Sequence, residues 1–243
     1  VYIYGMEGDD TLTGSAFGDY LDGGDGDDTL TGGDGDDLLV GNGGSDILRG
    51  QGGDDYLIEL GGDSQIDGGA GFDSLFVWSD TGVTLDLATA SIEWVQGSVL
   101  GGDTLNAAAN TVNTYLYGWG GADVLTGGSA NDYIAGGVGN DTLTGGAGND
   151  TLIGETGTDR YVYTAATWGS DTIHSFDPNS ETLDFTAVAS IHSFADFTAF
   201  EWDPGNLGYN STTLFHTDGG TTSSITLIGV QVASLSDGDF LFA

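Results

Sequence analysis

Aspartate recurs every nine residues in two parts of the chain, and this spacing is the clearest sign of chemistry in the sequence. The series consists of Asp10, Asp19, Asp28, Asp37, Asp46, Asp55 and Asp73, followed by Asp123, Asp132, Asp141, Asp150 and Asp159. Stacked carboxylates and turn carbonyls suit calcium, which takes about six to eight oxygen ligands. Magnesium fits less well because it demands a tight octahedron and keeps its waters. The chain has no cysteine, and its three histidines lie outside both series, so the expected cofactor is calcium.

The composition also calls for a counter-cation. Asp and Glu number 38 against 2 Lys and Arg, which gives a formal net charge of −36. Binding to nucleic acid or to an anionic membrane is excluded, because each phosphate contact needs a Lys or Arg and only Arg49 and Arg160 are present. Hydrophobic residues at 38% and aromatic residues at 11% argue against a wholly disordered chain. No apolar run approaches the roughly 18 residues of a membrane-spanning helix, so no membrane insertion is expected.

The aspartates occupy position six of a nine-residue block, which is present eight times over residues 5–76 and five times over residues 118–162. Position eight is apolar or aromatic in every block: Leu12, Leu21, Leu30, Leu39, Leu48, Leu57, Ile66 and Leu75, then Leu125, Ile134, Leu143, Leu152 and Tyr161. A block of this length fits a six-residue turn and a three-residue strand whose middle side chain points inward. Two blocks then make one helical rung, with turns alternating between two edges.

A metal ion must contribute to folding, because each block buries only one large side chain while its glycine-rich turn is costly to order. With alternating turns, each ion lies between block n and block n+2. The expected aspartate pairs are Asp10 with Asp28, Asp19 with Asp37, Asp28 with Asp46, Asp37 with Asp55, Asp55 with Asp73, Asp123 with Asp141, Asp132 with Asp150, and Asp141 with Asp159. Glycines allow positive φ and let successive carbonyls point at one ion. The expected carbonyl positions are Gly23, Gly26, Gly32, Gly35, Gly136, Gly139, Gly145 and Gly148.

Three blocks, GGDGDDTLT (residues 23–31), GGVGNDTLT (136–144) and GGAGNDTLI (145–153), resemble the G-G-x-G-x-D-x-U-x repeat of RTX proteins. The resemblance covers residues 1 to about 163. It implies an all-β fold, a parallel β-roll that is a calcium-stacked solenoid of nonapeptide repeats. It also implies a Gram-negative exoprotein, secreted or at the cell surface, that leaves the cell through type I secretion machinery. Ser64 replaces an aspartate, so a site that pairs it with Asp46 is expected to be weak or absent.

The predicted organisation has four parts. A first array covers residues 1–76, an insert covers 77–117, a second array covers 118–163, and a β-rich segment over 164–243 caps the roll. The insert is expected to continue the roll with longer turns, with Leu85, Val95, Leu105 and Leu116 inward. An alternative is a sugar-binding site around Trp78, Trp94, Tyr115, Tyr117 and Trp119. The ending at residues 239–243, an acidic residue before hydrophobic ones, is similar to the RTX secretion signal.

No catalytic arrangement is evident. His174, His192 and His216 are scattered, and neither an H-E-x-x-H helix nor a G-x-S-x-G turn is present. We therefore expect a noncatalytic chain, with any catalytic or adhesive domain upstream of Val1, since the chain begins within the pattern and is expected to be a fragment or processed product.

The favoured function is a calcium-binding module that folds on meeting extracellular calcium and supports type I secretion. Roughly eight ions would bring the charge from −36 to about −20. Two alternatives stay open: an adhesin or surface-layer region with calcium-dependent contacts, and the noncatalytic tail of a secreted hydrolase or polysaccharide-modifying enzyme.

Overall fold

The computed structural model describes residues 1–60, 62, 65–202 and 211–242, so Ser64 lies outside the described residues. The chain forms two compact units, Val1–Leu105 and Asn106–Ala243. Both are built from β-strands. The helical elements in the described ranges are single 3-10 turns: η1 (Leu87–Thr89), η2 (Phe194–Asp196), η3 (Val232–Ser234) and η4 (Asp237–Asp239). The fold is therefore all-β, as predicted, and no helix within these ranges has the length and apolar character needed to cross a membrane.

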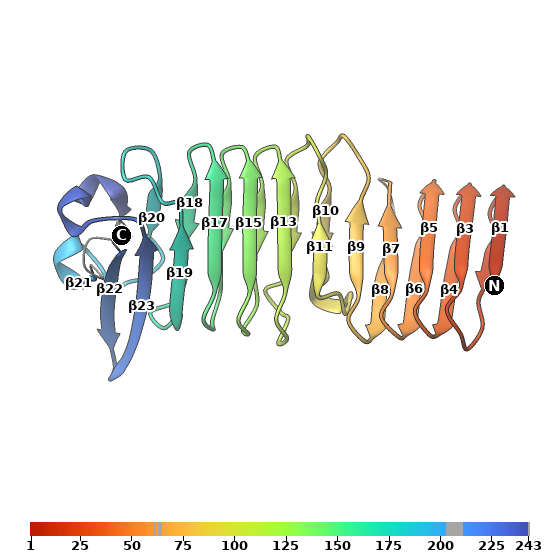
Figure 1. Cartoon of the computed structure of the whole chain (residues 1–243), viewed down its shortest axis with the longest axis horizontal. Helices are drawn as coiled ribbons and strands as arrows, with labels where there is room; N and C mark the ends of the chain where they lie inside the picture. Colours follow the sequence, from red (N-terminus) through yellow and green to blue (C-terminus); the bar gives the residue numbers. More distant parts are fainter. Residues whose placement is uncertain (61, 63–64, 203–210, 243) are drawn as a thin grey trace. The chain divides into compact units, whose positions relative to one another are not determined.

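The first unit is a parallel β-roll, in which each strand pairs with the strand two places away in the chain (Figure 1). Its strands are β1 (Tyr2–Glu7), β2 (Thr11–Thr13), β3 (Tyr20–Asp25), β4 (Thr29–Asp34), β5 (Leu38–Gly43), β6 (Ile47–Gly52), β7 (Tyr56–Glu59), β8 (Gln65–Ala70), β9 (Ser74–Val77), β10 (Thr84–Asp86) and β11 (Trp94–Gln96), and β12 (Thr104–Asn106) spans the boundary. One sheet has the order β1-β3-β5-β7-β9-β11, and the other has β2-β4-β6-β8. Turns therefore alternate between two edges, as the nine-residue block predicts.

Leucines at position eight form the core of this unit. Leu21 pairs in register with Leu39, and the same row continues through Leu57 and Leu75 to Val95. All five side chains are fully buried. The interval between partners is 18 residues up to Leu75 and 20 residues from Leu75 to Val95, and each apolar side chain lies directly on the preceding one.

The second sheet of the first unit is interrupted after β8. Ile66 and Leu85 are only half-buried, although both are expected to point inward. Strands β8 and β10 belong to different sheets, and the segment after β10 turns through η1 and buries Leu87 and Ile92 instead. Leu85 is the least exposed residue of β10 and lines the same cavity as the buried Leu75, so its inward orientation stays a prediction. A cavity of about 510 Å³ lies beside Ile66 and Leu85.

The second unit repeats the parallel architecture. Its strands are β13 (Tyr115–Gly120), β14 (Val124–Thr126), β15 (Tyr133–Val138), β16 (Thr142–Thr144), β17 (Thr151–Thr156), β18 (Arg160–Val162), β19 (Ser170–His174), β20 (Thr182–Asp184), β21 (Thr198–Trp202), β22 (Ser211–Asp218), β23 (Thr221–Ile228) and β24 (Phe240–Leu241). Strands β13, β15, β17, β19 and β23 are parallel neighbours, and β22 and β21 add an antiparallel edge. The other sheet has the order β14-β16-β18-β20-β24.

An aromatic core lies in the last part of the second unit. Trp168, Phe185 and Phe240 are buried, and the ring of Phe185 lies 5.7 Å from that of Trp168. His216 is also buried, where it stacks on Trp168 and lies 3.2 Å from the Ser190 hydroxyl. Phe240 pairs with Leu183 in the outermost parallel pair of the second sheet. The hydrophobic residues near the C-terminus thus pack onto the roll.

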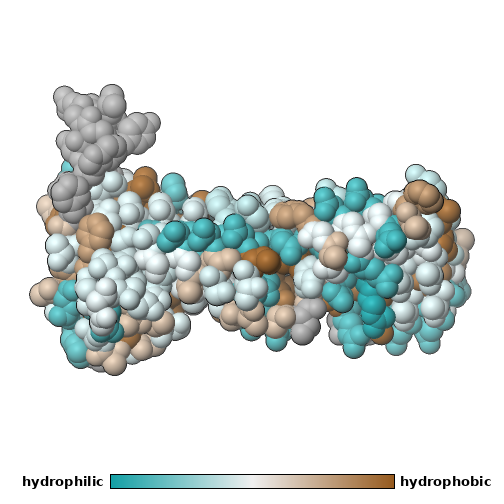
Figure 2. Space-filling model, turned by 90° about the horizontal axis from the view of Figure 1, so that it is seen from below, coloured by the Kyte–Doolittle hydropathy of each residue, from teal (hydrophilic) through white to brown (hydrophobic). Residues whose placement is uncertain are grey.

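Polar residues at position five form a second, exposed ladder outside the core. The backbone N–H of Asn149 donates to Asn131 Oδ1 at 2.8 Å, and that of Asn131 donates to Asn113 Oδ1 at 3.2 Å. In the first unit, Asp27 N–H donates to Asp9 Oδ1 at 3.0 Å. Figure 2 shows hydrophilic side chains in several groups on the surface in view, with hydrophobic residues in separate patches between them. The turns are therefore polar on the outside and hydrogen-bonded from rung to rung.

Candidate metal centre

The aspartates of position six lie at the start of each strand and are buried. All are exposed by 6% or less except Asp10, which is half-buried. The aspartate and the apolar residue of position eight are two residues apart, so their side chains point to the same face of the strand. The geometry that buries the leucine therefore also buries the carboxylate.

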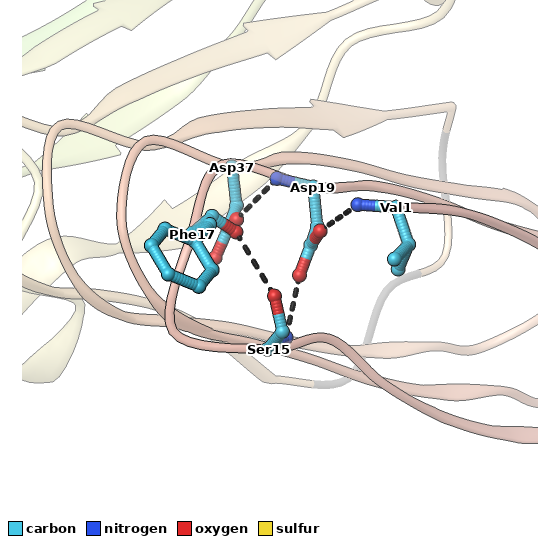
Figure 3. A network of polar contacts seen from close by, with 5 residues as sticks. All are labelled: Val1, Ser15, Phe17, Asp19 and Asp37. Carbon is cyan, nitrogen blue, oxygen red and sulfur yellow. Dashed lines mark hydrogen bonds and ion pairs between the residues drawn. The ribbon is translucent and has the colours of Figure 1, made fainter.

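In the first unit the aspartates form two hydrogen-bonded ladders. The backbone N–H of Asp19 donates to Asp37 Oδ1 at 2.7 Å, and the ladder continues to Asp55 and Asp73 with distances of 2.8 Å. The other ladder joins Asp10 to Asp28 at 2.7 Å and Asp28 to Asp46 at 2.8 Å. Figure 3 shows Asp19 between Asp37 and the nitrogen of Val1.

The second unit has the same arrangement. Asp123 N–H donates to Asp141 Oδ1, and Asp141 N–H donates to Asp159 Oδ1, both at 2.9 Å. The N–H of Asp132 donates to Asp150 Oδ1 at 2.9 Å. The structure thus brings together the two members of each aspartate pair expected from the sequence, and in each pair they lie one rung apart.

The second carboxylate oxygen, Oδ2, is the feature that points to a ligand. In the described part of the chain, buried Oδ2 atoms that receive no hydrogen bond include those of Asp10, Asp28, Asp37, Asp55, Asp73, Asp141 and Asp150. A buried polar atom without a partner costs free energy, more so when it is charged. Each of these oxygens therefore needs a proton or a cation as a partner.

The glycines at position one leave open the space in front of Oδ2. A Cβ built on Gly32 would collide with Asp37 Oδ2 and lie 2.9 Å from the carbonyl oxygen of Gly50. Gly23 lies in the same way between Asp28 and Gly41, so a carboxylate of one block and a carbonyl two blocks later converge there. Gly136 and Gly145 have the same relation to the carboxylates of their own blocks.

The glycines at position four adopt the backbone conformation that the turn requires. Gly26, Gly35, Gly139 and Gly148 all have φ between +100° and +159°, a region that L-residues with side chains rarely adopt. A Cβ at Gly26 would lie 2.5 Å from the carbonyl oxygen of Gly8, so the turns are stacked closely. Of the eight glycines named from the sequence, five lie in turns, and three lie within strands β3, β4 and β15, namely Gly23, Gly32 and Gly136.

Two aspartates differ from the others because their own turn supplies a donor. Asp19 Oδ2 accepts the N–H of Ser15 at 2.5 Å, as Figure 3 shows, and Asp132 Oδ2 accepts the N–H of Gly128 at 2.7 Å. In the first of these turns Phe17 replaces a glycine, and its side chain is exposed. These two carboxylates are less available to an added ligand.

Burial raises the pKa values of the ladder carboxyls. Desolvation raises the pKa of Asp37 and Asp141 to about 6 and that of Asp150 to about 7, although each accepts a backbone hydrogen bond that acts in the opposite direction. Desolvation also raises the pKa of Asp28 and Asp159. The charged form is thus unfavourable in the metal-free fold, which is the behaviour of a carboxylate that needs a counter-ion.

Side chains alone do not form a metal centre. In the described ranges no group of three or more His, Asp or Glu side chains is placed to hold an ion. A cation held here must therefore take backbone carbonyls among its ligands, and a hard cation such as calcium accepts them.

The ladders extend further than the nine-residue series. Asp73 N–H donates to Glu93 Oε2 at 2.9 Å, Val83 N–H donates to Asp103 Oδ1 at 2.8 Å, and Asp150 N–H donates to Asp171 Oδ1 at 3.0 Å. Sequence reasoning missed these acids because their spacings of 20 and 21 residues break the period. A signal was present, since each acid precedes a buried apolar residue by two positions.

Glu181 is another such acid, and desolvation raises its pKa to about 8. It is buried, and its Oε2 lies 3.5 Å from the hydroxyl of Tyr161. Like Asp171, whose pKa desolvation also raises to about 8, it lies at the last rungs of the parallel stack.

The chain resembles several known proteins. It is 25% identical to the AlgE6R2 subunit of the mannuronan C5-epimerase of Azotobacter vinelandii, over 68% of this chain and 88% of that one, with a TM-score of 0.35. It is 24% identical to the AlgE6R3 subunit, over 68% and 80%, with a TM-score of 0.29. It is 22% identical to the extracellular lipase LipA of Serratia marcescens, over 93% of this chain and 40% of the lipase, with a TM-score of 0.34. No curated protein matches the chain.

The repeat itself is matched by a family model, the RTX calcium-binding nonapeptide repeat, in four copies at residues 4–39, 31–58, 115–134 and 126–161. This match assigns calcium binding, rather than catalysis, to these segments. Both matched regions coincide with parallel rungs that carry the aspartate ladders. Residues 4–58 and 115–161 of this protein are therefore RTX calcium-binding nonapeptide repeats, folded as a parallel β-roll.

Proposed function

We propose that the chain is the calcium-dependent folding module of a secreted Gram-negative protein, unfolded in the cytosol and folded once it meets extracellular calcium. The observation that carries this proposal is the row of buried carboxylate oxygens without hydrogen-bond partners, such as those of Asp37 and Asp55. At neutral pH a carboxylate in this position needs a cation, because protonation alone leaves it partly charged.

Each proposed ion lies between two aspartates one rung apart, with turn carbonyls as further ligands. The eight pairs named from the sequence give roughly eight ions and a charge of about −20 when all are bound. Weaker sites are expected at the pairs of Asp19 with Asp37 and Asp132 with Asp150, because a backbone N–H already occupies one oxygen in each.

The same electrostatics suit export. Without calcium, a net charge of −36 and stacked carboxylates favour an expanded chain, which could pass through a narrow type I secretion channel. Outside the cell, calcium at millimolar concentration would drive folding by mass action, so that binding and folding are one event.

We also propose that residues 77–117 continue the roll and that residues 164–243 cap it. Parallel pairing of β11 with β9 supports the first proposal. Pairing of β23 with β19 and of β24 with β20, together with the aromatic core around Phe185, supports the second.

Far-UV circular dichroism tests the proposal directly. The chain should show little β structure in excess chelator and a cooperative gain of β signal as calcium rises into the millimolar range, whereas magnesium at the same concentration should have little effect. Equal β content and equal melting temperature with chelator and with calcium would contradict calcium-dependent folding.

A further inference from the structure

A groove on the outer face of the second unit has a composition that the calcium sites do not explain. It lies across β13, β15 and β17, which Figure 1 shows as neighbouring green strands, and has a volume of about 330 Å³. Its lining consists of Tyr117, Trp119, Ala135, Gly137, Val138 and Glu155. Its residues are apolar or aromatic except for one carboxylate.

The sheet register explains the shape of the groove. Trp119 on β13, Gly137 on β15 and Glu155 on β17 are consecutive partners in one row across the three strands. Trp119 and Glu155 flank Gly137 in this row, so their backbones lie two strand spacings, about 10 Å, apart, and both residues line the groove. Ala135 fills the neighbouring place beside Tyr117 with a single methyl group.

Trp119 and Glu155 are held in an unfavourable backbone conformation. Their φ values are +71° and +72°; the same block position has glycine at Gly24 and Gly137, with φ of +104° and +107°, and other residues with positive φ at Met6, Asn42 and Gln51. A bulky residue in this region costs free energy relative to glycine. Burial does not offset this cost, since the Trp119 side chain is 52% exposed. Glycine at position 119 or 155 would therefore relieve this cost, as it would at the other non-glycine residues in this block position.

The lining favours an organic cation. Aromatic faces attract quaternary ammonium groups through cation–π interactions, and an opposing carboxylate adds direct charge complementarity. A neutral sugar would gain hydrogen bonds from Tyr117, Trp119 and Glu155, but it would leave the carboxylate without a counter-charge. An anionic ligand would meet both Glu155 and the large negative charge of the chain.

We propose that this groove binds a small soluble quaternary ammonium ion of the choline type, with Tyr117 and Trp119 against its methyl groups and Glu155 opposite its charge. This site is separate from the aspartate ladders. It makes the second unit a recognition surface as well as a calcium-bound scaffold.

The test is a calorimetric titration of the calcium-loaded chain with choline and with its neutral isostere, 3,3-dimethylbutan-1-ol. Choline should bind with saturation at one site, and the isostere should bind at least about tenfold more weakly, which corresponds to about 1.4 kcal/mol. Equal binding of the two compounds, or saturable binding of glucose in place of choline, would overturn the assignment to a cation.

Variants separate recognition from folding. Trp119→Gly introduces the residue that six of the thirteen blocks have at this position, so it should abolish choline binding while the melting temperature stays the same or rises. Glu155→Gln should weaken binding about tenfold and reduce its dependence on salt. Trp78→Ala, which removes another exposed tryptophan, serves as the matched control and should leave binding unchanged. A Trp119→Gly variant that still binds choline, or that melts at a lower temperature, would refute the proposed role of the indole.

Discussion

Replacement of Asp141 by asparagine should have opposite effects on stability with and without calcium. Asp141 is 1% exposed, accepts the N–H of Asp123 through Oδ1 and has no hydrogen bond to Oδ2 in the described part of the chain. Asparagine keeps the Oδ1 acceptor and the shape of the side chain but cannot ionise. The substitution therefore removes a buried charge while it preserves the ladder.

The size of the effect follows from the pKa. Burial raises the pKa of Asp141 from 3.8 to about 6, so the folded, calcium-free chain holds this proton more tightly than the unfolded chain does. The stability that this carboxyl contributes is complete below pH 3.8 and is lost as the pH rises to about 6. At neutral pH the loss is on the order of 3 kcal/mol. D141N should recover up to that amount in chelator and nothing at pH 3.

In the presence of calcium, D141N should instead lower the stability of the folded chain. Asp141 takes part in two proposed sites, one with Asp123 and one with Asp159. Loss of its charge should raise the calcium concentration at half-saturation at least tenfold, which is about 1.4 kcal/mol. The assay is circular dichroism of wild type and variant against urea, pH and calcium.

Asp218→Asn is the matched control. This residue is exposed at the end of β22, and its substitution changes the net charge by the same amount. It should have little effect in either condition. If D141N destabilised the chain equally in chelator and in calcium, or if D218N reproduced its effects, the charge of the ladder would not be the cause.

Three further outcomes are expected. Gly32→Ala should strongly lower the melting temperature of the calcium-bound chain, because the added Cβ would collide with Asp37 Oδ2. Gly43→Ala is the control and should have a small effect, because its Cβ would lie 3.4 Å from the nearest atom. Calcium affinity measured by calorimetry should fall as the pH drops from 8 to 6, because protons compete for carboxyls such as Asp150, with a pKa of about 7, and binding should release protons into the buffer. Asp171→Asn should weaken calcium binding in the second unit, although Asp171 lies outside the nine-residue series. An unchanged calcium titration would show that Asp171 does not contribute to calcium binding.

The strict period is what made most of this fold predictable. Once one block is assigned a strand with Leu30 inward, every block at a multiple of 18 residues places its position eight in the same row, and the blocks between them form the corresponding row of the other sheet. The predictable part ends where the period does. Leu85 satisfies the spacing but is only half-buried, and the buried residues that follow it, Leu87 and Ile92, fall outside the period.

The acids beyond the series were missed for a related reason. Glu93 and Asp171 lie 20 and 21 residues from their partners, because additional residues in the turns lengthen the rung without moving the strand. The longer side chain of Glu93 still brings a carboxylate oxygen to 2.9 Å from the Asp73 nitrogen. A search for an acid two residues before an apolar residue, rather than for a fixed period, would have found both.

That two-residue offset explains why this fold depends on a cation. Side chains two apart on a strand point to the same face, so any block that buries Leu30 also directs Asp28 into the turn. There its Oδ1 satisfies the N–H of Asp10, which would otherwise be buried without an acceptor, so the carboxylate cannot be replaced by an apolar group without cost. Its Oδ2 is then buried by the same geometry. A proton can neutralise this oxygen in acid, but at neutral pH only a cation can do so for the whole ladder. The backbone hydrogen bonds of the ladder and the need for calcium therefore have one cause, the two-residue offset between the aspartate and the apolar residue.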